Sequence, residues 1–302
     1  MTGELRGVIP ITATPFDAAG QVDEASIGTL VEWEARCGVR GLNVLGIMGE
    51  AHKLSEGERR RVAEVFVKCA AGRFPVVVGT SHGGTAVVVE LSQAAEAAGA
   101  AAVMVAPPTG LRGEAAILAH YRTVAGAIGI PVVVQDEPVT TGVLMSPELL
   151  VRIATEIPAC RYVKLEEPPT PTKITAMRRL PGGDGVRIFG GMNAMYFYEE
   201  LSRGAVGIMT GAAVPDVLVE IQTAFERGDR AGAAALFDRY ASYIRYEGQQ
   251  GVGLALRKEV LRLRGAIATS VVRQPGPALD AVTRQELHDI LTRAGIKLGV
   301  RP

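Results

Sequence analysis

The chain has 302 residues, of which 48% are hydrophobic, so it is long enough to bury one large core. Lysine plus arginine and aspartate plus glutamate both number 32, which gives a formal net charge of zero. Because no basic field marks the chain as a binder of nucleic acid or of anionic membranes, we expect a small-molecule partner.

No targeting or membrane segment is apparent in the sequence. Residues 1–11 lack a charged region followed by an apolar one, and no later stretch stays apolar for the roughly 18 residues that a membrane helix needs. The three cysteines are far apart and form no CxxC pair, as expected in a reducing compartment. We therefore expect a cytoplasmic protein that contacts no membrane.

Eight short runs rich in Val, Ile and Leu alternate with longer amphipathic stretches. The runs predict strands at Gly7–Thr12, Gly41–Leu45, Pro75–Gly79, Ala101–Ala106, Pro131–Gln135, Arg161–Leu165, Val186–Phe189 and Ala205–Met209. The stretches predict helices at Glu24–Cys37, Ser55–Ala71, Thr85–Ala98, Glu114–Ala127, Pro147–Glu156, Thr172–Leu180, Met192–Ser202 and Asp216–Arg227. Such alternation is typical of a parallel sheet, and eight units favour an α/β fold closed as a (β/α)8 TIM barrel over an open sheet.

Two predicted helices begin with residues that typically cap the N-terminus of a helix. Ser55 and Glu58 have the spacing of a capping box, in which each side chain accepts a hydrogen bond from the backbone N–H of the other residue. Ser146 precedes Pro147, which puts a hydroxyl N-cap before a proline at the first helical position. Both signals support helices that begin near these residues.

The last quarter of the chain contains no further strand pattern. Its helical stretches are Asp229–Gly248, Gly253–Arg264 and Thr283–Ala294. They are too few and too rich in alanine to promise a core of their own. We therefore expect a barrel over residues 1–228 and a C-terminal helical extension over residues 229–302 that packs on it.

Lys164 is the candidate nucleophile. In a (β/α)8 barrel the site lies at the carboxyl ends of the strands, and Lys164 lies near the end of the sixth predicted strand among apolar neighbours that favour a neutral amine. Such an amine attacks a carbonyl, and the iminium that results draws electrons from the neighbouring carbon without a metal or another cofactor. Alternatively, Lys164 extends its ammonium to solvent or forms a structural ion pair with Glu166 or Glu167.

Other candidates follow the second and fifth predicted strands. Gly46 and Gly49 can form a tight turn whose backbone N–H groups hold a carboxylate, although glycines at such a turn more often serve the turn geometry alone. Asp136 and Glu137 offer carboxylates for acid–base chemistry. Since adjacent residues at a strand end point in opposite directions, at most one of the two should face the site.

Motifs for metals and nucleotides are missing from the sequence. It has no HExxH, no Cys/His cluster with zinc spacing, no EF-hand loop, no GxGxxG and no Walker loop. His52 and His82 could reach the mouth of the barrel, but either is more easily explained as a structural residue. We therefore expect neither a bound metal nor a cofactor.

Taken together, these landmarks resemble the dihydrodipicolinate synthase and N-acetylneuraminate lyase family of pyruvate-dependent class I aldolases and related lyases. The resemblance spans nearly the whole chain. It rests on Gly7–Phe16 with Thr14-Pro15-Phe16, Gly46–Glu50 followed by Leu54 and Glu58, Pro138 with Thr141-Gly142, Val163-Lys164, Phe189-Gly190-Gly191 and the helical tail. It implies that Lys164 forms a Schiff base with a 2-oxo acid. It also implies a homo-oligomer, a dimer or a tetramer.

The chain departs from the family pattern in the proton-transfer network. Ile47 and Met48 replace the two hydroxyl residues between the glycines, so the carboxylate would be held by backbone N–H groups alone. Gln135 occupies the position of the tyrosine that relays protons, and an amide has no useful pKa for that task. The second, cross-subunit tyrosine falls near Pro108 and Thr109. The resemblance therefore implies a remodelled site.

These departures limit which activity the resemblance implies. Dihydrodipicolinate synthesis is disfavoured, because Val139 and Thr140 occupy the stretch where synthases carry an arginine. We expect one of four carboxylates to replace the tyrosine as proton carrier. The four are Asp136, Glu137, Glu166 and Glu167.

We predict a Schiff-base lyase or aldolase that acts on a 2-oxo acid, by carbon–carbon cleavage, by condensation with pyruvate or by dehydration of a deoxy sugar acid. The predicted catalytic residues are Lys164, Gln135 and Glu166. The predicted substrate-binding residues are Gly46, Ile47, Met48, Gly49, Gly191 and Met209. The main alternative is an inactive or regulatory barrel that binds a small carboxylate ligand, since a fold alone does not carry function. A barrel that uses the carboxylates with an exogenous metal is a weaker alternative.

Overall fold

The computed structural model describes residues 4–299, which form an eight-stranded parallel barrel. Each strand pairs in parallel with the next along the chain from β2 to β8, and β8 pairs with β1. A bridge between Ile11 and Asn43 links the remaining edges. The strands are β1 Gly7–Pro10, β2 Leu42–Val44, β3 Val76–Gly79, β4 Ala102–Val105, β5 Val132–Asp136, β6 Tyr162–Leu165, β7 Arg187–Gly190 and β8 Gly207–Thr210. The predicted TIM barrel is confirmed.

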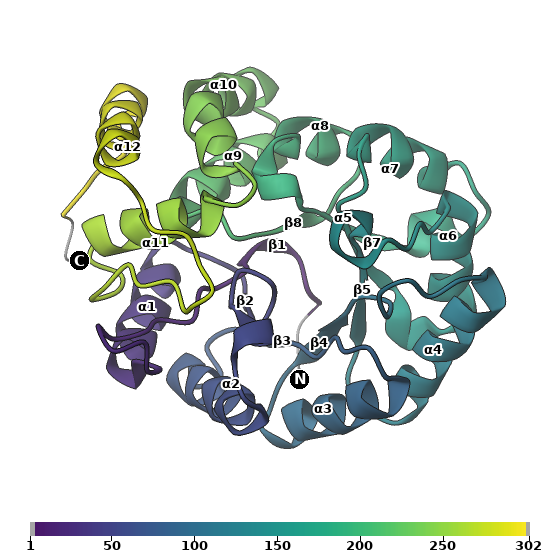
Figure 1. The fold of residues 1–302 in the computed structure, drawn as a ribbon. Helices are drawn as coiled ribbons and strands as arrows, with labels where there is room; N and C mark the ends of the chain where they lie inside the picture. Colours follow the sequence, from purple (N-terminus) through teal and green to yellow (C-terminus); the bar gives the residue numbers. More distant parts are fainter. Residues whose placement is uncertain (1–3, 300–302) are drawn as a thin grey trace.

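Helices form a ring around these strands (Figure 1). They are α1 Glu24–Arg36, α2 Glu56–Ala70, α3 Thr85–Ala97, α4 Glu114–Gly126, α5 Pro138–Thr141, α6 Pro147–Glu156, α7 Thr170–Arg178, α8 Phe197–Ser202 and α9 Pro215–Glu226. Short 3-10 turns are η1 Ala51–Lys53, η2 Pro158–Cys160, η3 Gly183–Gly185 and η4 Met192–Ala194. The capping box of Ser55 and Glu58 is formed at the start of α2, and Ser146 caps α6.

One predicted helix is wrong. The sequence suggested a single helix over Met192–Ser202, but the structure has the η4 turn and then the separate helix α8. Met192, Asn193 and Ala194 all have positive φ, which no right-handed helix contains. Three successive left-handed residues without glycine are strained, and they lie at the carboxyl end of β7 beside the candidate site.

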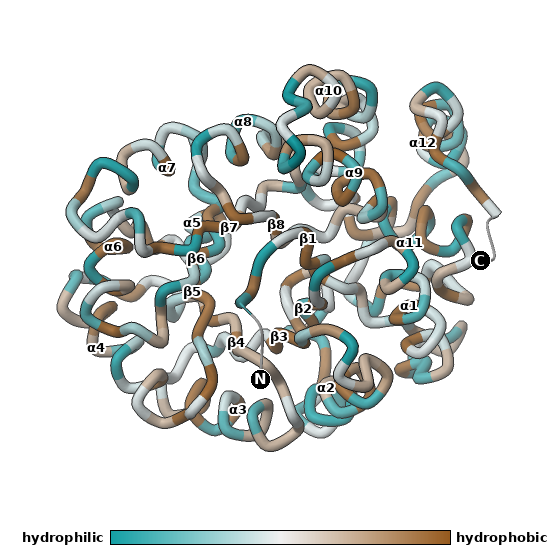
Figure 2. Tube along the Cα trace, turned by 180° about the vertical axis from the view of Figure 1, so that it is seen from behind, coloured by the Kyte–Doolittle hydropathy of each residue, from teal (hydrophilic) through white to brown (hydrophobic). Residues whose placement is uncertain are grey.

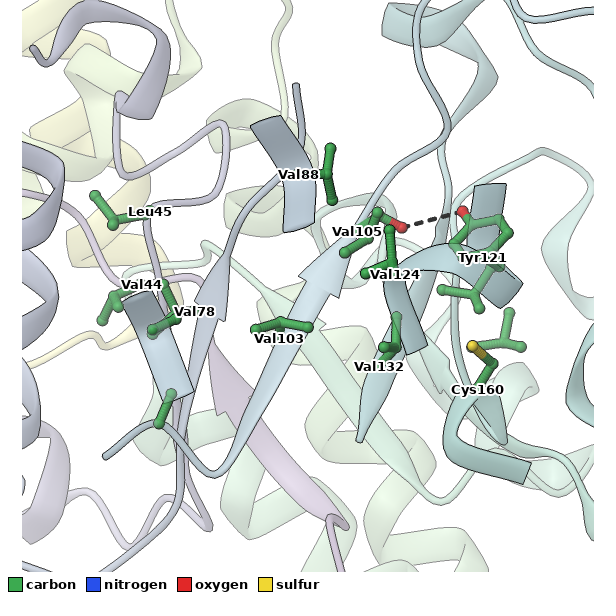
Figure 3. Close-up of a cluster of buried hydrophobic side chains, with 14 of the residues drawn as sticks. Val44, Leu45, Val78, Val88, Val103, Val105, Tyr121, Val124, Val132 and Cys160 are labelled. Carbon is green, nitrogen blue, oxygen red and sulfur yellow. Dashed lines mark hydrogen bonds between the residues drawn. The ribbon is translucent and has the colours of Figure 1, made fainter. Parts of the chain in front are cut away.

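Alternation along the strands divides the buried residues between two sides of the sheet. Ile9, Val133, Tyr162 and Phe189 fill the barrel interior together with residues of the other strands. The residues between them point outward and pack under the helices. Figure 3 shows part of this outer layer, where Val103, Val105 and Val132 of β4 and β5 meet Tyr121 and Val124 of α4, and the Tyr121 hydroxyl donates to the carbonyl of Val105 at 3.1 Å. Each fully buried apolar side chain contributes about 1.5–3 kcal/mol relative to an exposed one.

Hydropathy follows this arrangement along the chain. Hydrophobic residues gather along the strands, whereas the exposed helix α2 is largely hydrophilic (Figure 2). Among residues 4–299 no helix combines the length and the apolar character that crossing a membrane requires.

The C-terminal extension packs on one side of the barrel. It consists of α10 Arg230–Glu247, α11 Gly253–Leu263 and α12 Ala281–Ala294, which gather near α9 and α1 (Figure 1). Leu256 and Val260 of α11 share one buried cluster with Trp33 of α1 and Leu218 of α9. The extension therefore shares its core with the barrel helices, and the division at residues 228 and 229 stays a prediction.

Candidate active site

A cavity of about 410 Å³ opens at the carboxyl ends of the strands and contains Lys164, Gln135 and Glu166 in its wall. A second cavity, of about 550 Å³, lies beside it at the ends of β2, β3 and β4, and both His52 and His82 line this second one. Ile47, Gln135 and Glu137 border both cavities. We take the cavity with Lys164 as the candidate site, because it contains the candidate nucleophile.

The pairing of β5 with β6 brings the three predicted catalytic residues together. Gln135 and Lys164 are partners in the ladder, and only 4% of Lys164 is exposed. The Lys164 Nζ lies 2.7 Å from Glu166 Oε2, and the same oxygen accepts a hydrogen bond from Gln135 Nε2 at 3.0 Å. The ion pair expected as the structural alternative is therefore present, and it involves Glu166 rather than Glu167.

Glu166 occupies the space beside Gly191. A Cβ atom at Gly191 would overlap the Glu166 side chain, and a Cβ atom at Gly190 would overlap that of Glu200. The Gly191 position thus accommodates the candidate acid–base residue. Gly191 itself, which the sequence analysis placed among the substrate-binding residues, borders neither cavity.

The four mouth carboxylates separate into two groups. Asp136 and Glu167 both pair with Lys173, at 2.7 Å in the case of Asp136, and neither lines the cavity with Lys164. Burial raises the pKa of Asp136 to about 6, although Lys173 opposes that shift. Glu137 lines the cavity together with Glu166, and burial raises its pKa as well. The expectation that at most one of Asp136 and Glu137 faces the site agrees with this geometry.

The turn after β2 is a tight one. Leu45 and Glu50 have φ of 59° and 55°, and the Thr14 hydroxyl donates to the Gly49 carbonyl at 2.6 Å. A Cβ atom at Gly49 would lie 2.9 Å from the Leu45 nitrogen, so this glycine is needed for the turn itself.

The predicted substrate-binding residues are distributed unevenly around the cavity. Ile47 and Met48 line the cavity that contains Lys164, and Gly46 lines the neighbouring one. Gly49 borders neither. Met209 is fully buried in the barrel interior, opposite Ile9 in the ladder, and borders neither cavity. Its predicted contact with substrate has no support in this geometry.

Arg257 of α11 and Asn193 of η4 are among the cavity-wall residues that the sequence analysis missed. The Arg257 guanidinium contacts Met48 Sδ and donates to Asn193 Oδ1, while its Nε lies 3.4 Å from Glu247 Oε1. Arg257, Lys258 and Glu259 are consecutive charged residues that span about 200° of a helix, so they cannot all face solvent. That pattern was the available signal.

No metal centre is evident among the side chains that the structure describes. Within residues 4–299, no group of three or more His, Cys, Asp or Glu side chains is arranged to hold a metal ion. The candidate site instead offers one amine, two carboxylates, one guanidinium and four side-chain amides, those of Gln135, Asn193, Gln249 and Gln250.

The fold and the cavity define the class of this protein as a (β/α)8 barrel with a lysine, a carboxylate and an amide together at the carboxyl ends of β5 and β6. Residues 4–294 match the model of the dihydrodipicolinate synthetase family. The chain belongs to this family, so the resemblance noted from the sequence is confirmed.

Individual relatives cover almost the whole chain. L-2-keto-3-deoxyarabonate dehydratase of Azospirillum brasilense is 35% identical over 95% of this chain and 94% of its own length. 4-Hydroxy-tetrahydrodipicolinate synthase of Nitrobacter hamburgensis is 32% identical over 97% of this chain and 98% of its own. The family thus includes dehydratases and synthases, and membership supports a lyase.

Solved structures agree in fold. The crystal structure of dihydrodipicolinate synthase from Rhodopseudomonas palustris has a TM-score of 0.92 at 39% identity, covering 97% of this chain and 99% of that one. The structure of YagE, a prophage protein of E. coli K12, in complex with pyruvate has a TM-score of 0.91 at 25% identity. The match covers 98% of this chain and 100% of that one.

Proposed function

We propose that the protein is a Schiff-base-forming lyase that dehydrates a 2-keto-3-deoxy sugar acid. The observation that carries the proposal is the contact of Glu166 Oε2 with both Lys164 Nζ and Gln135 Nε2 in one cavity. An amine and a carboxylate that share a hydrogen bond can exchange a proton, which leaves the amine free to attack a carbonyl. The name of the Azospirillum relative, a dehydratase of a 2-keto-3-deoxy acid, supports this choice of reaction.

The first half of the proposed reaction activates the substrate. Lys164 attacks the C2 carbonyl, and loss of one water molecule from the carbinolamine gives an iminium at C2. The iminium makes the hydrogen on C3 acidic. Glu166 removes that hydrogen as a proton, and the electron pair of the C–H bond forms an enamine.

The second half expels the hydroxyl from C4. The enamine electrons form a new double bond between C3 and C4 while the C4–O bond breaks, and Glu166 returns its proton to the departing oxygen to give water. Hydrolysis of the remaining iminium consumes one water, releases the dehydrated 2-oxo acid and restores Lys164. Gln135 has no proton to exchange, and its hydrogen bond to Glu166 fixes the carboxylate near the lysine.

Carbon–carbon cleavage passes through the same iminium and is the second candidate reaction. It needs a base at the C4 hydroxyl rather than at C3, and Glu137, which lines the same cavity, is available there. Dihydrodipicolinate synthesis stays disfavoured, because Val139 and Thr140 occupy the stretch where synthases carry an arginine. Relatives with the synthase name match nearly the whole chain, so the extent of the match does not separate the two reactions. A homo-oligomer is part of the proposal as an expectation from the family.

The test is borohydride trapping followed by product analysis. Wild-type protein and Lys164→Ala are incubated with pyruvate or with 2-keto-3-deoxy acids of five and six carbons, reduced, and analysed by intact-mass spectrometry. We expect an adduct in the wild type alone, and a product without borohydride that is 18 Da lighter than the substrate by the loss of one water. Release of pyruvate would indicate an aldolase instead. The absence of any adduct would favour the barrel that only binds a carboxylate.

A further inference from the structure

Arg257 is a buried cation in the wall of the candidate site, and nearby anions do not fully neutralise its charge. Only 8% of the residue is exposed. Its two hydrogen-bonding partners, Met48 Sδ and Asn193 Oδ1, are both neutral, and a thioether sulfur is a weak acceptor. Burying a guanidinium is costly unless an anion is near, so this arrangement leaves a place for one.

Glu247 is the one acidic group among the described residues within 4 Å of the Arg257 guanidinium. Its Oε1 is 3.4 Å from the Arg257 Nε, in a geometry that is not a hydrogen bond, and it already accepts from the backbone N–H of Ala213 at 2.9 Å. Burial raises the pKa of Glu247 to about 7, so near neutral pH this carboxyl is only partly ionised. The Nη side of Arg257 faces Met48 and has no acidic partner of its own.

The turn that carries Met48 offers further donors. Among the described residues, no acceptor takes the backbone N–H groups of Ile47 or Met48, whereas those of Gly49 and Glu50 are used within the turn. Gly211 at the end of β8 leaves room here, because a Cβ atom would lie 2.8 Å from Met48 Cγ and 3.1 Å from Arg257 Nη1. Two backbone N–H groups without an acceptor and one guanidinium therefore belong to the same cavity wall, beside Met48.

We propose that Arg257 adds a guanidinium to the carboxylate site expected at the turn after β2, and so binds the carboxylate of the 2-oxo acid whose carbonyl reacts with Lys164. A guanidinium matches a carboxylate with two parallel hydrogen bonds, which is stronger and more directional than a hydroxyl contact. It would supply the carboxylate contact that a turn with Ile47 and Met48 cannot make through side chains. The inference rests on the proposed function and makes the C-terminal extension part of the substrate site.

Asn193 is the positioning residue in this arrangement. Its Oδ1 accepts from Arg257 Nη2 and its Nδ2 donates to the Ile244 carbonyl at 2.7 Å. The left-handed conformation of residues 192–194 brings this side chain over to the extension. Strain that persists at such a turn is consistent with a functional constraint.

The experiment compares a charged and an uncharged ketone in borohydride trapping. Half-saturating concentrations of pyruvate and of methyl pyruvate are measured for wild type, Arg257→Gln and Arg262→Gln, each checked by its melting temperature. Arg262 lies on the same helix, has an exposed side chain that pairs with Glu259, and serves as the matched control. We expect Arg257→Gln to raise the value for pyruvate at least tenfold and that for methyl pyruvate less than threefold, with no change in the control.

Equal losses for the two ketones, or no loss for pyruvate, would overturn the proposal. If wild-type protein traps neither ketone, the Schiff-base function fails, and the carboxylate site is then judged by calorimetric titration of pyruvate into wild type and Arg257→Gln. Binding that weakens at least tenfold in the variant would support the site without the reaction. Binding that is unchanged or absent would refute both.

Discussion

Lys258 of α11 and Glu50 of the turn after β2 form an ion pair in which neither side chain is exposed. The Lys258 ammonium also lies 4.3 Å from the centre of the Phe16 ring and donates to the Val271 carbonyl. The second carboxylate oxygen of Glu50 accepts from Lys53 and from the backbone N–H of Arg273, both at 3.0 Å. This cluster fixes the extension to the turn that borders the site.

Removing one partner of this pair should destabilise the whole protein. We expect Lys258→Ala to lower the free energy of unfolding by about 3–5 kcal/mol, because Glu50 would stay buried without its main counter-charge. Urea denaturation measures the change. The exposed Lys68→Ala is the control and should stay within about 0.5 kcal/mol of wild type. A loss in Lys258→Ala as small as in the control would contradict a stabilising role for the pair.

Glu166 and Glu167 are adjacent, but we expect only the first to matter for turnover. Glu166→Gln keeps the shape and the hydrogen bond to Gln135 but removes the proton carrier, so kcat should fall about 10²–10⁴-fold. Borohydride trapping on Lys164 should persist but become slower, because glutamine cannot take the proton of the ammonium group. Glu167→Gln, which loses only its pair with Lys173, should retain kcat within a few-fold. Steady-state measurements of kcat for both variants test this difference. Comparable rates in the two would transfer the role to Glu137.

A methyl group at Gly191 should disturb the same carboxylate. A Cβ atom at position 191 would overlap the Glu166 side chain, so Gly191→Ala should displace Glu166 and reduce kcat at least tenfold. The trapping of pyruvate should change less. Gly57→Ala is the matched control, since Gly57 is exposed in α2 and its Cβ would meet no atom within 4 Å. That control should preserve kcat and raise stability by about 0.4–1 kcal/mol. Full activity in Gly191→Ala would mean that Glu166 is not constrained there.

Glu200 should make stability depend on pH. Burial raises its pKa to about 8, while Thr170 donates to it and opposes the shift. In the unfolded chain the carboxyl ionises near 4.5, so between about pH 4.5 and 8 the folded protein binds more protons than the unfolded one. Its contribution is therefore present at low pH and is lost as the pH rises through 8, with a slope of at most about 1.4 kcal/mol per pH unit.

Urea unfolding at pH 5, 6.5 and 8 tests this dependence. Glu200→Gln, which cannot ionise, should lose less stability across this range than wild type does. Glu34 is buried against Thr12 with its pKa raised to about 8 for the same reason, so part of the dependence should remain in the single variant. Identical profiles for wild type and Glu200→Gln would show that Glu200 titrates alike in the folded and unfolded chains.

The barrel could be predicted from the sequence because each strand and helix is defined by residues that are neighbours in the chain. Strand ends differ from the prediction by one or two residues in most cases, since each strand is a short, continuous apolar run that is buried on both faces. The break of the predicted helix at Met192–Ala194 could not be foreseen, because these residue types carry no preference for positive φ. Only tertiary contacts, such as that of Asn193 with Ile244, stabilise it there.

The site was predictable where it follows strand ends and was missed where it depends on long-range packing. Lys164 and Gln135 lie on adjacent strands and Glu166 directly follows β6, so their approach follows from the topology. Whether Lys164 would pair with Glu166 or with Glu167 depended on side-chain direction, which Lys173 decides by binding Glu167. Arg257 is separated from Met48 by 209 residues, and no local pattern links the two.

The ion pair of Glu50 with Lys258 joins residues 208 positions apart, and this has a consequence for synthesis on the ribosome. While the first half-barrel emerges, Glu50 has no counter-charge from α11, because that helix has not yet been translated. The turn after β2 therefore lacks its main counter-charge until α11 has left the exit tunnel. A nascent or truncated chain that lacks α11 would contain Lys164 but would leave Glu50 without this counter-charge, so we expect the wall of the candidate site to stay incomplete until α11 has been made.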